Sequence, residues 1–190
     1  MTTLSLLACN EISKIEWPNQ ASEISLHSKA TDIATDFKIN RPLVIDSNTK
    51  AVEAEYLMKK AHVKLKLVLD KADNFIGTLS FNDLNDQEII KKAAIGVDRS
   101  ELIVTDFMRM KATLKSIDWS ALEHISIKTL VHFLKDRTEQ HILITDEKGN
   151  TLRGLISASD IARRLQLDVN LNLPINFKLI SQAITKGIED

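Results

Sequence analysis

Two short segments of the chain place a glycine, a hydroxyl and a carboxylate at the same spacing. They are Gly77, Ser80 and Asp83 in the first half, and Gly154, Ser157 and Asp160 in the second. A serine followed three residues later by an acidic residue is typical of a helix N-cap, where the hydroxyl stabilises the helix by about 1 kcal/mol. The unpaired N–H groups of a helix start also suit an anion such as phosphate. Both segments are therefore candidates for capping and for anion binding.

These segments close two longer stretches that resemble each other. Three further matches keep the same order along the chain: Thr35-Asp36-Phe37 with Thr105-Asp106-Phe107, Ile45-Asp46 with Ile117-Asp118, and Leu67-Val68-Leu69-Asp70 with Leu143-Ile144-Thr145-Asp146. The spacing between matches differs by only a few residues, as loop insertions would make it. The sequence therefore predicts an internal duplication.

The hydrophobic pattern predicts the same elements in both copies. In the first copy we expect a short helix over 29–34, a strand over 42–45, a helix whose apolar face is Ala51, Ala54, Met58 and Ala61, a half-buried strand carrying Leu65, Leu67 and Leu69, a strand over 75–79, and a helix that begins at Ser80. In the second copy the helix carries Ile127, Leu130, Val131 and Leu134, and the strands are 141–144 and 151–156. Each copy is thus a βαββα unit.

A unit of about sixty residues buries too little surface to be stable alone. Two such units are expected to pack together about a pseudo-twofold axis, which covers the second face of each sheet and leaves a cleft between the copies. The predicted fold class is α+β. The predicted segments are an N-terminal extension (1–27), repeat 1 (28–86), a linker helix (87–103), repeat 2 (104–167) and a C-terminal tail (168–190).

The composition excludes several classes of protein. With 44% hydrophobic and 27% charged residues the chain matches soluble globular domains, and a formal charge of −1 gives no general attraction for DNA. No apolar run is long enough for a membrane helix. Cys9 is the single cysteine, so no internal disulfide can form, which fits a cytoplasmic location. The five histidines show no metal spacing, and no Ser–His–Asp arrangement can be assigned, so no metal site and no catalytic residues are predicted.

With these residues in place, the chain resembles a tandem cystathionine-β-synthase (CBS) domain pair. The resemblance extends from Ser28 to Leu167 and depends above all on the two Gly/Ser/Asp segments, with Asp106-Phe107-Met108 in support. In family members that bind adenosine compounds, the hydroxyl of this motif contacts phosphate and the carboxylate contacts ribose. The resemblance therefore implies phosphate contacts for Ser80 and Ser157, and ribose contacts for Asp83 and Asp160. Gly77 and Gly154 are expected to bind the nucleotide as well, because glycine lets the backbone approach the ligand closely. It also implies that residues 39–44 and 110–114 flank the adenine.

The sequence departs from the family pattern at two places, and the apolar pair and the arginines of the second motif favour it as the occupied site. Thr78 stands where an aliphatic residue is usual, whereas Leu155-Ile156 is standard. A glycine common before the second strand of each unit is replaced by Ala61-His62 in one copy and by Lys135-Asp136 in the other. Arg163 and Arg164 follow the second motif only. His62 and His141 are expected near the mouth of the cleft, with surface or packing roles favoured over phosphate contacts.

The predicted function is that of a non-catalytic sensor. We expect a homodimer that binds an adenosine-containing nucleotide (AMP, ADP, ATP, S-adenosylmethionine or similar), needs no cofactor, and acts on an unknown protein partner in trans. One alternative is a structural dimerisation module whose serines serve only as caps. A second is an uncharacterised enzyme that uses the cleft carboxylates as acid and base. In the tail, Phe177, Ile180 and Ile184 share one helical face, which is expected to cover the protein's own core or to bind a partner.

Overall fold

The computed structural model of the chain describes residues 24–84, 86–93, 96, 98–146, 149–170 and 173–189. Its strands are β1 (Thr35–Asp36), β2 (Val44–Asp46), β3 (Leu65–Leu69), β4 (Phe75–Ser80), β5 (Arg109–Met110), β6 (Ser116–Asp118), β7 (His141–Thr145) and β8 (Leu152–Ser157). Its α-helices are α1 (Ala51–Lys60), α2 (Asp86–Ala93), α3 (Trp119–Glu123), α4 (Ile127–Phe133), α5 (Ala158–Arg164) and α6 (Phe177–Glu189). Short 3-10 helices are η1 (Ala30–Ile33), η2 (Phe81–Leu84), η3 (Val104–Asp106) and η4 (Lys111–Thr113). Cys9 and most of the expected N-terminal extension lie outside the described residues.

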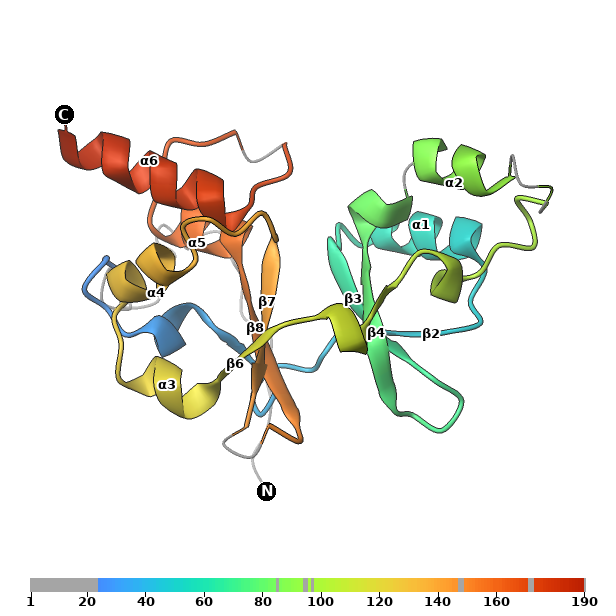
Figure 1. Cartoon of the computed structure of the whole chain (residues 1–190), viewed down its shortest axis with the longest axis horizontal. Helices are drawn as coiled ribbons and strands as arrows, with labels where there is room; N and C mark the ends of the chain where they lie inside the picture. The colour runs from blue at the N-terminus through green and yellow to red at the C-terminus, as the bar shows by residue number, and fades with distance from the viewer. Residues whose placement is uncertain are drawn as a thin grey trace, which may run out of the picture.

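The strands form two four-stranded sheets with equivalent orders, β2-β3-β4-β5 and β1-β8-β7-β6. In each sheet the central pair is an antiparallel hairpin, and a parallel strand lies beside its first member. Figure 1 shows α1 and α2 over one sheet and α3 to α6 beside the other. The predicted α+β fold with two equivalent units is confirmed. No helix in the described ranges has the length and apolar character needed to span a membrane.

The edge strand of each sheet comes from the other half of the chain. β1 pairs with β8, where Thr35 lies opposite Leu155 and Asp36 opposite Gly154. In the same way β5 pairs with β4. The connection from β1 to β2 therefore crosses from the second sheet to the first, and the connection from β5 to β6 crosses back. The predicted contiguous repeats 28–86 and 104–167 are interleaved in space.

The two hydrophobic cores show the same exchange. The first core lies under α1 and contains Met58 and Val68, but also Val104 and Phe107 from the segment that precedes β5. The second core consists of buried side chains of α3 to α6, β7 and β8 together with η1: Ala30, Ile33, Trp119, Leu122, Ile127, Leu130, Val131, Leu134, Ile142, Ile144, Ile156, Ala158, Ile161, Ala162, Ile175, Phe177 and Ile180. Neither core is complete without a segment from the other half.

The exchange corrects one part of the sequence alignment. The Asp32 carboxylate accepts a hydrogen bond from the Lys29 N–H at 3.2 Å, and the Asp106 carboxylate accepts one from the Ile103 N–H at 2.9 Å. Thr31-Asp32 is thus the structural equivalent of Thr105-Asp106, and the match with Thr35-Asp36 was wrong. Two Thr-Asp pairs stand four residues apart in the first copy, and the sequence match selected the one followed by phenylalanine.

The two faces of β3 differ in what they pack against. Val68 is fully buried and belongs to the first core, whereas Leu67 is 5% exposed and lies outside both cores. Leu143 of β7 is likewise buried outside the cores. Leu65 and Leu67 line the larger cavity between the sheets, whereas the residue of β3 that packs in the first core is Val68.

Other local expectations were wrong at element ends. β2 begins at Val44 instead of 42, Ala61 is the exposed C-cap of α1, and Ser80 leads into η2 instead of an α-helix. By contrast, Ala51, Ala54 and Met58 of α1 are buried as expected, and the apolar face of α4 is confirmed. The tail helix α6 covers the second core with Phe177 and Ile180, so the expectation that its stripe packs on the protein itself is confirmed.

Gly154→Ala tests the exchange of the edge strands. A Cβ built on Gly154 would lie 2.4 Å from the Thr35 carbonyl oxygen, so β1 would have to shift away from β8. We expect a loss of about 2 kcal/mol in the free energy of unfolding, measured by urea denaturation. The matched control is Gly187→Ala in α6, where nothing lies within 4 Å and the helix gains about 1 kcal/mol. Equal effects of the two substitutions would contradict the exchanged pairing.

Candidate functional site

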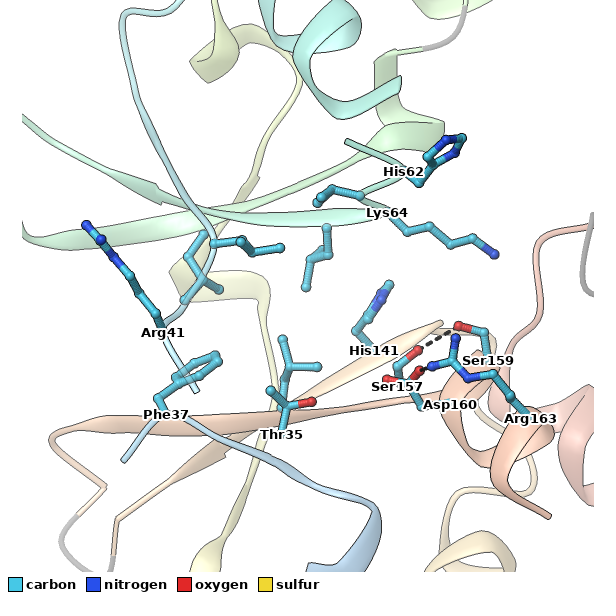
Figure 2. A pocket seen from close by; sticks show the side chains of 15 residues that line it. Thr35, Phe37, Arg41, His62, Lys64, His141, Ser157, Ser159, Asp160 and Arg163 are labelled. Atoms are coloured by element: carbon cyan, nitrogen blue, oxygen red, sulfur yellow. Dashed lines mark hydrogen bonds and ion pairs between the residues drawn. The ribbon is translucent and has the colours of Figure 1, made fainter. Parts of the chain in front are cut away.

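Two cavities lie between the two sheets of the described residues, and the larger of them has a volume of about 500 Å³. The connection from β1 to β2 forms one wall, β3 and the segment before it form another, and β7, β8 and α5 form the rest (Figure 2). Its lining residues are Thr35, Phe37, Arg41, Leu43, His62, Val63, Lys64, Leu65, Leu67, His141, Leu155, Ser157, Ser159, Asp160 and Arg163. The strand exchange makes this cavity, because the crossing connection is one of its walls.

The charges of this lining are mainly positive. Arg41, Lys64 and Arg163 contribute cations, and Asp160 is the one carboxylate among the lining residues that the structure describes. Asp160 forms an ion pair with Arg163 one turn later on α5. Leucines from β3 and β8 form the apolar part of the wall. The cavity therefore combines an apolar centre with an excess of positive charge.

Ser157 stands at the N-cap of α5, but its hydroxyl does not cap the helix. Ser157 is 6% exposed, and its Oγ lies 2.8 Å from the Oγ of Ser159, which also lines the cavity. The hydroxyl is thus held at the cavity wall without satisfying a helix N–H. Capping alone does not explain this residue.

A smaller cavity of about 140 Å³ is lined by Ser80 of the first motif. There the Ser80 hydroxyl accepts a hydrogen bond from the Asn82 N–H at 3.3 Å, and the Asp83 carboxylate accepts one from the Ser80 N–H at 3.2 Å. Asp83 also pairs with Arg109 at 3.4 Å and is not among the residues that line the cavity. In the first motif the serine and the aspartate are engaged with their own backbone, as the capping interpretation expects.

The motif glycines line neither cavity. A Cβ on Gly77 would meet the Arg109 carbonyl oxygen at 2.3 Å, just as one on Gly154 would meet that of Thr35. Both glycines therefore admit the backbone of the exchanged edge strand. Close approach is the reason for glycine here, but the group that approaches is a strand of the same protein.

The segments expected to flank an adenine are divided between the cavities. Arg41 and Leu43 line the larger cavity, and Thr113 and Leu114 line the smaller one. Ile39 is 84% exposed and lines neither. Each pair of lining residues lies on one of the crossing connections.

His141, the first residue of β7, lines both cavities. Burial lowers the pKa of its imidazole to about 4, and the nearby cations Lys64 and Arg109 act in the same direction. His141 is therefore neutral at pH 7. The sequence placed it near the cleft but gave no indication that it separates the two cavities.

His62 has a left-handed backbone, with a φ of 52°. It follows α1, where its N–H donates to the Lys59 carbonyl and the Val63 N–H donates to that of Met58, which is a Schellman motif. Glycine is favoured in this conformation, so the family position that carries glycine has a physical reason. Histidine replaces it at the cavity wall.

A cluster of side chains that the sequence did not reveal holds the end of β1 at the cavity wall. The Arg153 guanidinium lies 3.6 Å from the centre of the Trp119 ring and 3.2 Å from the Asp36 carboxylate. Although burial of Asp36 raises its pKa, hydrogen bonds from the Lys38 N–H and from Arg153 outweigh it, so the pKa is lowered. The Phe37 N–H donates to the Arg153 carbonyl at 2.7 Å. Phe37 is thereby held at the cavity.

No metal centre is indicated: within the described ranges, no group of three or more His, Cys, Asp and Glu side chains could hold an ion. No protein-family model matches the chain, and no curated protein matches it.

Solved structures, however, share its fold. An uncharacterised conserved protein from Pyrococcus horikoshii is 17% identical with a TM-score of 0.55, covering 77% of this chain and 98% of its own. A hemolysin-like protein containing a CBS domain, from Oenococcus oeni, is 18% identical with a TM-score of 0.51, covering 74% and 92%. CBSX2 from Arabidopsis thaliana, solved in complex with AMP, is 17% identical with a TM-score of 0.50, covering 72% and 94%. The chain has the fold of a CBS-domain pair.

The stability of the free protein should depend on pH through His141. Its pKa is lower in the folded protein than the usual 6.5, so the unfolded chain binds the proton first and stability is lost as the pH falls from about 6.5 to about 4. When the pH falls from 7 to 4.5, the free energy of unfolding should decrease in both proteins. Urea denaturation should show that this decrease is about 1–2 kcal/mol smaller in His141→Gln than in the wild type. His132→Gln, at an exposed position of α4, is the control and should behave as the wild type. Identical pH profiles for His141→Gln and the wild type would contradict the burial of a neutral imidazole.

Proposed function

We propose that this protein is a regulatory module that binds an adenosine-containing nucleotide in the larger cavity and transmits its occupancy to a partner protein in trans. The observation that carries the proposal is the cavity itself. Its lining combines residues of the second motif, of the crossing connection and of the apolar strand faces of both repeats. Because it lies between the repeats, a ligand there contacts both.

The size and chemistry of the cavity support a nucleotide. Its volume of about 500 Å³ falls within the range of roughly 300–1,000 Å³ that is usual for small-molecule sites. An apolar centre suits a base, and the excess of cations suits phosphate. By contrast, the smaller cavity of about 140 Å³ is below that range, and its motif serine is engaged as a cap. The proposal therefore assigns the nucleotide to one cavity.

The arrangement of side chains suggests an orientation for the ligand. Lys64, Ser159 and Arg163 gather at one end of the cavity, and Phe37 and Arg41 lie at the other (Figure 2). We place the phosphate at the first end, where hydroxyls and cations converge, and the base toward Phe37. Asp160 would accept hydrogen bonds from the ribose hydroxyls, although its carboxylate is shared with Arg163.

The AMP complex of CBSX2 lends support by analogy, since that protein has the same fold. The identity of 17% is too low to carry ligand contacts over residue by residue. Ligand choice among AMP, ADP, ATP and S-adenosylmethionine is left to experiment. In this proposal the protein catalyses no reaction and needs no cofactor. It acts in the cytoplasm.

Substitution of either polar side chain of the second motif should strongly reduce the stabilisation of the protein by its ligand. For the wild type, a saturating nucleotide at one hundred times its dissociation constant adds about 2.7 kcal/mol, or roughly 5–10 °C in Tm. We expect Ser157→Ala and Asp160→Asn to reduce this shift strongly, because both side chains line the larger cavity. The matched control Ser80→Ala should keep it. A shift lost equally in Ser80→Ala, or no shift with any adenosine nucleotide at millimolar concentration, would favour the structural-module alternative.

We also propose a homodimer. Leu57 on α1 and Phe133 on α4 occupy equivalent positions of the two repeats, and their side chains are 43% and 66% exposed. Exposed large apolar side chains at equivalent places suit a symmetric interface between copies. Sedimentation equilibrium should give the mass of a dimer for the wild type and of a monomer for the double variant Leu57→Glu, Phe133→Glu. Lys128→Glu, an exposed position on α4, is the control for added charge. A monomeric wild type would overturn the dimer.

A further inference from the structure

His141 occupies a place that a packing role alone does not require. It begins β7, and its backbone pairs with Ser157 of β8. Figure 2 shows its imidazole directed into the larger cavity, beside the end where Ser157 and Ser159 lie. A phosphate bound at that end would therefore have the imidazole as a neighbour.

The groups around His141 determine when its ring can carry a proton. Those that line the two cavities with it are Lys64 before β3, Arg109 on β5, Lys115 before β6, His62 after α1, Arg41 on the crossing connection, Asp160 and Arg163 on α5, and Glu139 on the segment before β7. Cations outnumber carboxylates in this set, and Asp160 is paired with Arg163. In the free protein this balance opposes a further positive charge. A phosphate bound beside the ring offsets part of this positive charge and so favours the protonated imidazole.

We propose that His141 recognises the phosphate of the bound nucleotide by taking up a proton as the nucleotide binds. The proton comes from solvent, a ring nitrogen accepts it, and the resulting imidazolium donates a hydrogen bond to a phosphate oxygen. Nothing is oxidised and no covalent bond to the ligand forms. This inference rests on the proposed function, because the phosphate is that of the nucleotide in the larger cavity.

Proton uptake makes binding selective for phosphorylated ligands. An uncharged nucleoside gives no reason for the ring to charge, so its binding is not linked to the proton. Binding and protonation are thermodynamically linked. For each unit by which the ligand raises the pKa of His141, the protonated protein binds the ligand ten times more tightly than the neutral protein does. The pH dependence of binding therefore distinguishes a phosphate contact from a structural role of the same residue.

The test is an NMR titration of the histidine side chains of the full-length wild type between pH 4 and 8, alone, with saturating AMP and with adenosine. We expect AMP to raise the pKa of His141 from about 4 by at least one unit, which corresponds to at least a tenfold change in affinity, and adenosine to leave it unchanged. His132 on the surface of α4 serves as the internal control. An AMP complex in which resonances of the cavity shift while the titration of His141 does not would overturn the inference.

A sulfate arm separates failure of this inference from failure of the proposed function. If AMP perturbs no resonance of the cavity, the proposed function fails for AMP, and sulfate, which does not itself titrate in this range, decides the role of His141. A raised pKa in sulfate supports anion recognition by His141 without a nucleotide, and an unchanged pKa overturns it. As a second readout, calorimetry in two buffers of different ionisation enthalpy should show greater proton uptake on AMP binding by the wild type and His132→Gln than by His141→Gln.

Discussion

The exchange of edge strands between the two halves of the chain is the constraint on which the rest of the structure depends. β1 completes the sheet of β8, and β5 completes the sheet of β4. Each core also takes buried side chains from the other half, such as Ile33 in the second core and Val104 in the first. Consequently neither unit can form its sheet or its core without the other, and the connections that cross between the sheets become walls of the two cavities.

The two cavities are related by the duplication, yet their residues have diverged. In the larger one, Ser157 is buried at the wall with its hydroxyl turned to Ser159, and three cations surround an apolar centre. In the smaller one, the Ser80 hydroxyl is engaged by the Asn82 N–H, and Thr78 stands at the position equivalent to Leu155. Asp83 lies outside the lining and accepts a hydrogen bond from the Ser80 N–H. Duplication thus supplied two equivalent positions, and side-chain changes leave one of them suited to a ligand of nucleotide size.

Much of this architecture is predictable from the sequence because it depends on local patterns. The apolar period of α1, the hairpin of β3 and β4 and the duplicated Gly/Ser/Asp motif all depend on residues close together in the chain, and the structure has each of these elements. The exchange of β1 and β5 was missed because short edge strands carry little periodicity. Because the exchange was not predicted, the group expected close to Gly77 and Gly154 was a ligand. In the structure it is a backbone carbonyl of the exchanged strand.

The contents of the site were harder to predict for the same reason. Ser157 and Asp160 could be selected from the motif, whereas Arg41, Lys64 and His141 come together only through pairing between distant segments. Arg153 contacts Trp119 and Asp36 across the exchanged strand, and no local pattern links these three residues. The motif identified the side formed by β8 and α5, and the family resemblance pointed to residues 39–44 of the crossing connection, but Lys64 was missed.

A crystal structure of the protein grown with AMP tests the central claim most directly. The account predicts nucleotide density in the larger cavity, with the phosphate beside Ser157 and Arg163 and the base toward Phe37, and no nucleotide in the smaller cavity. Nucleotide bound beside Ser80, or a larger cavity left empty at a concentration that saturates binding in solution, would contradict it.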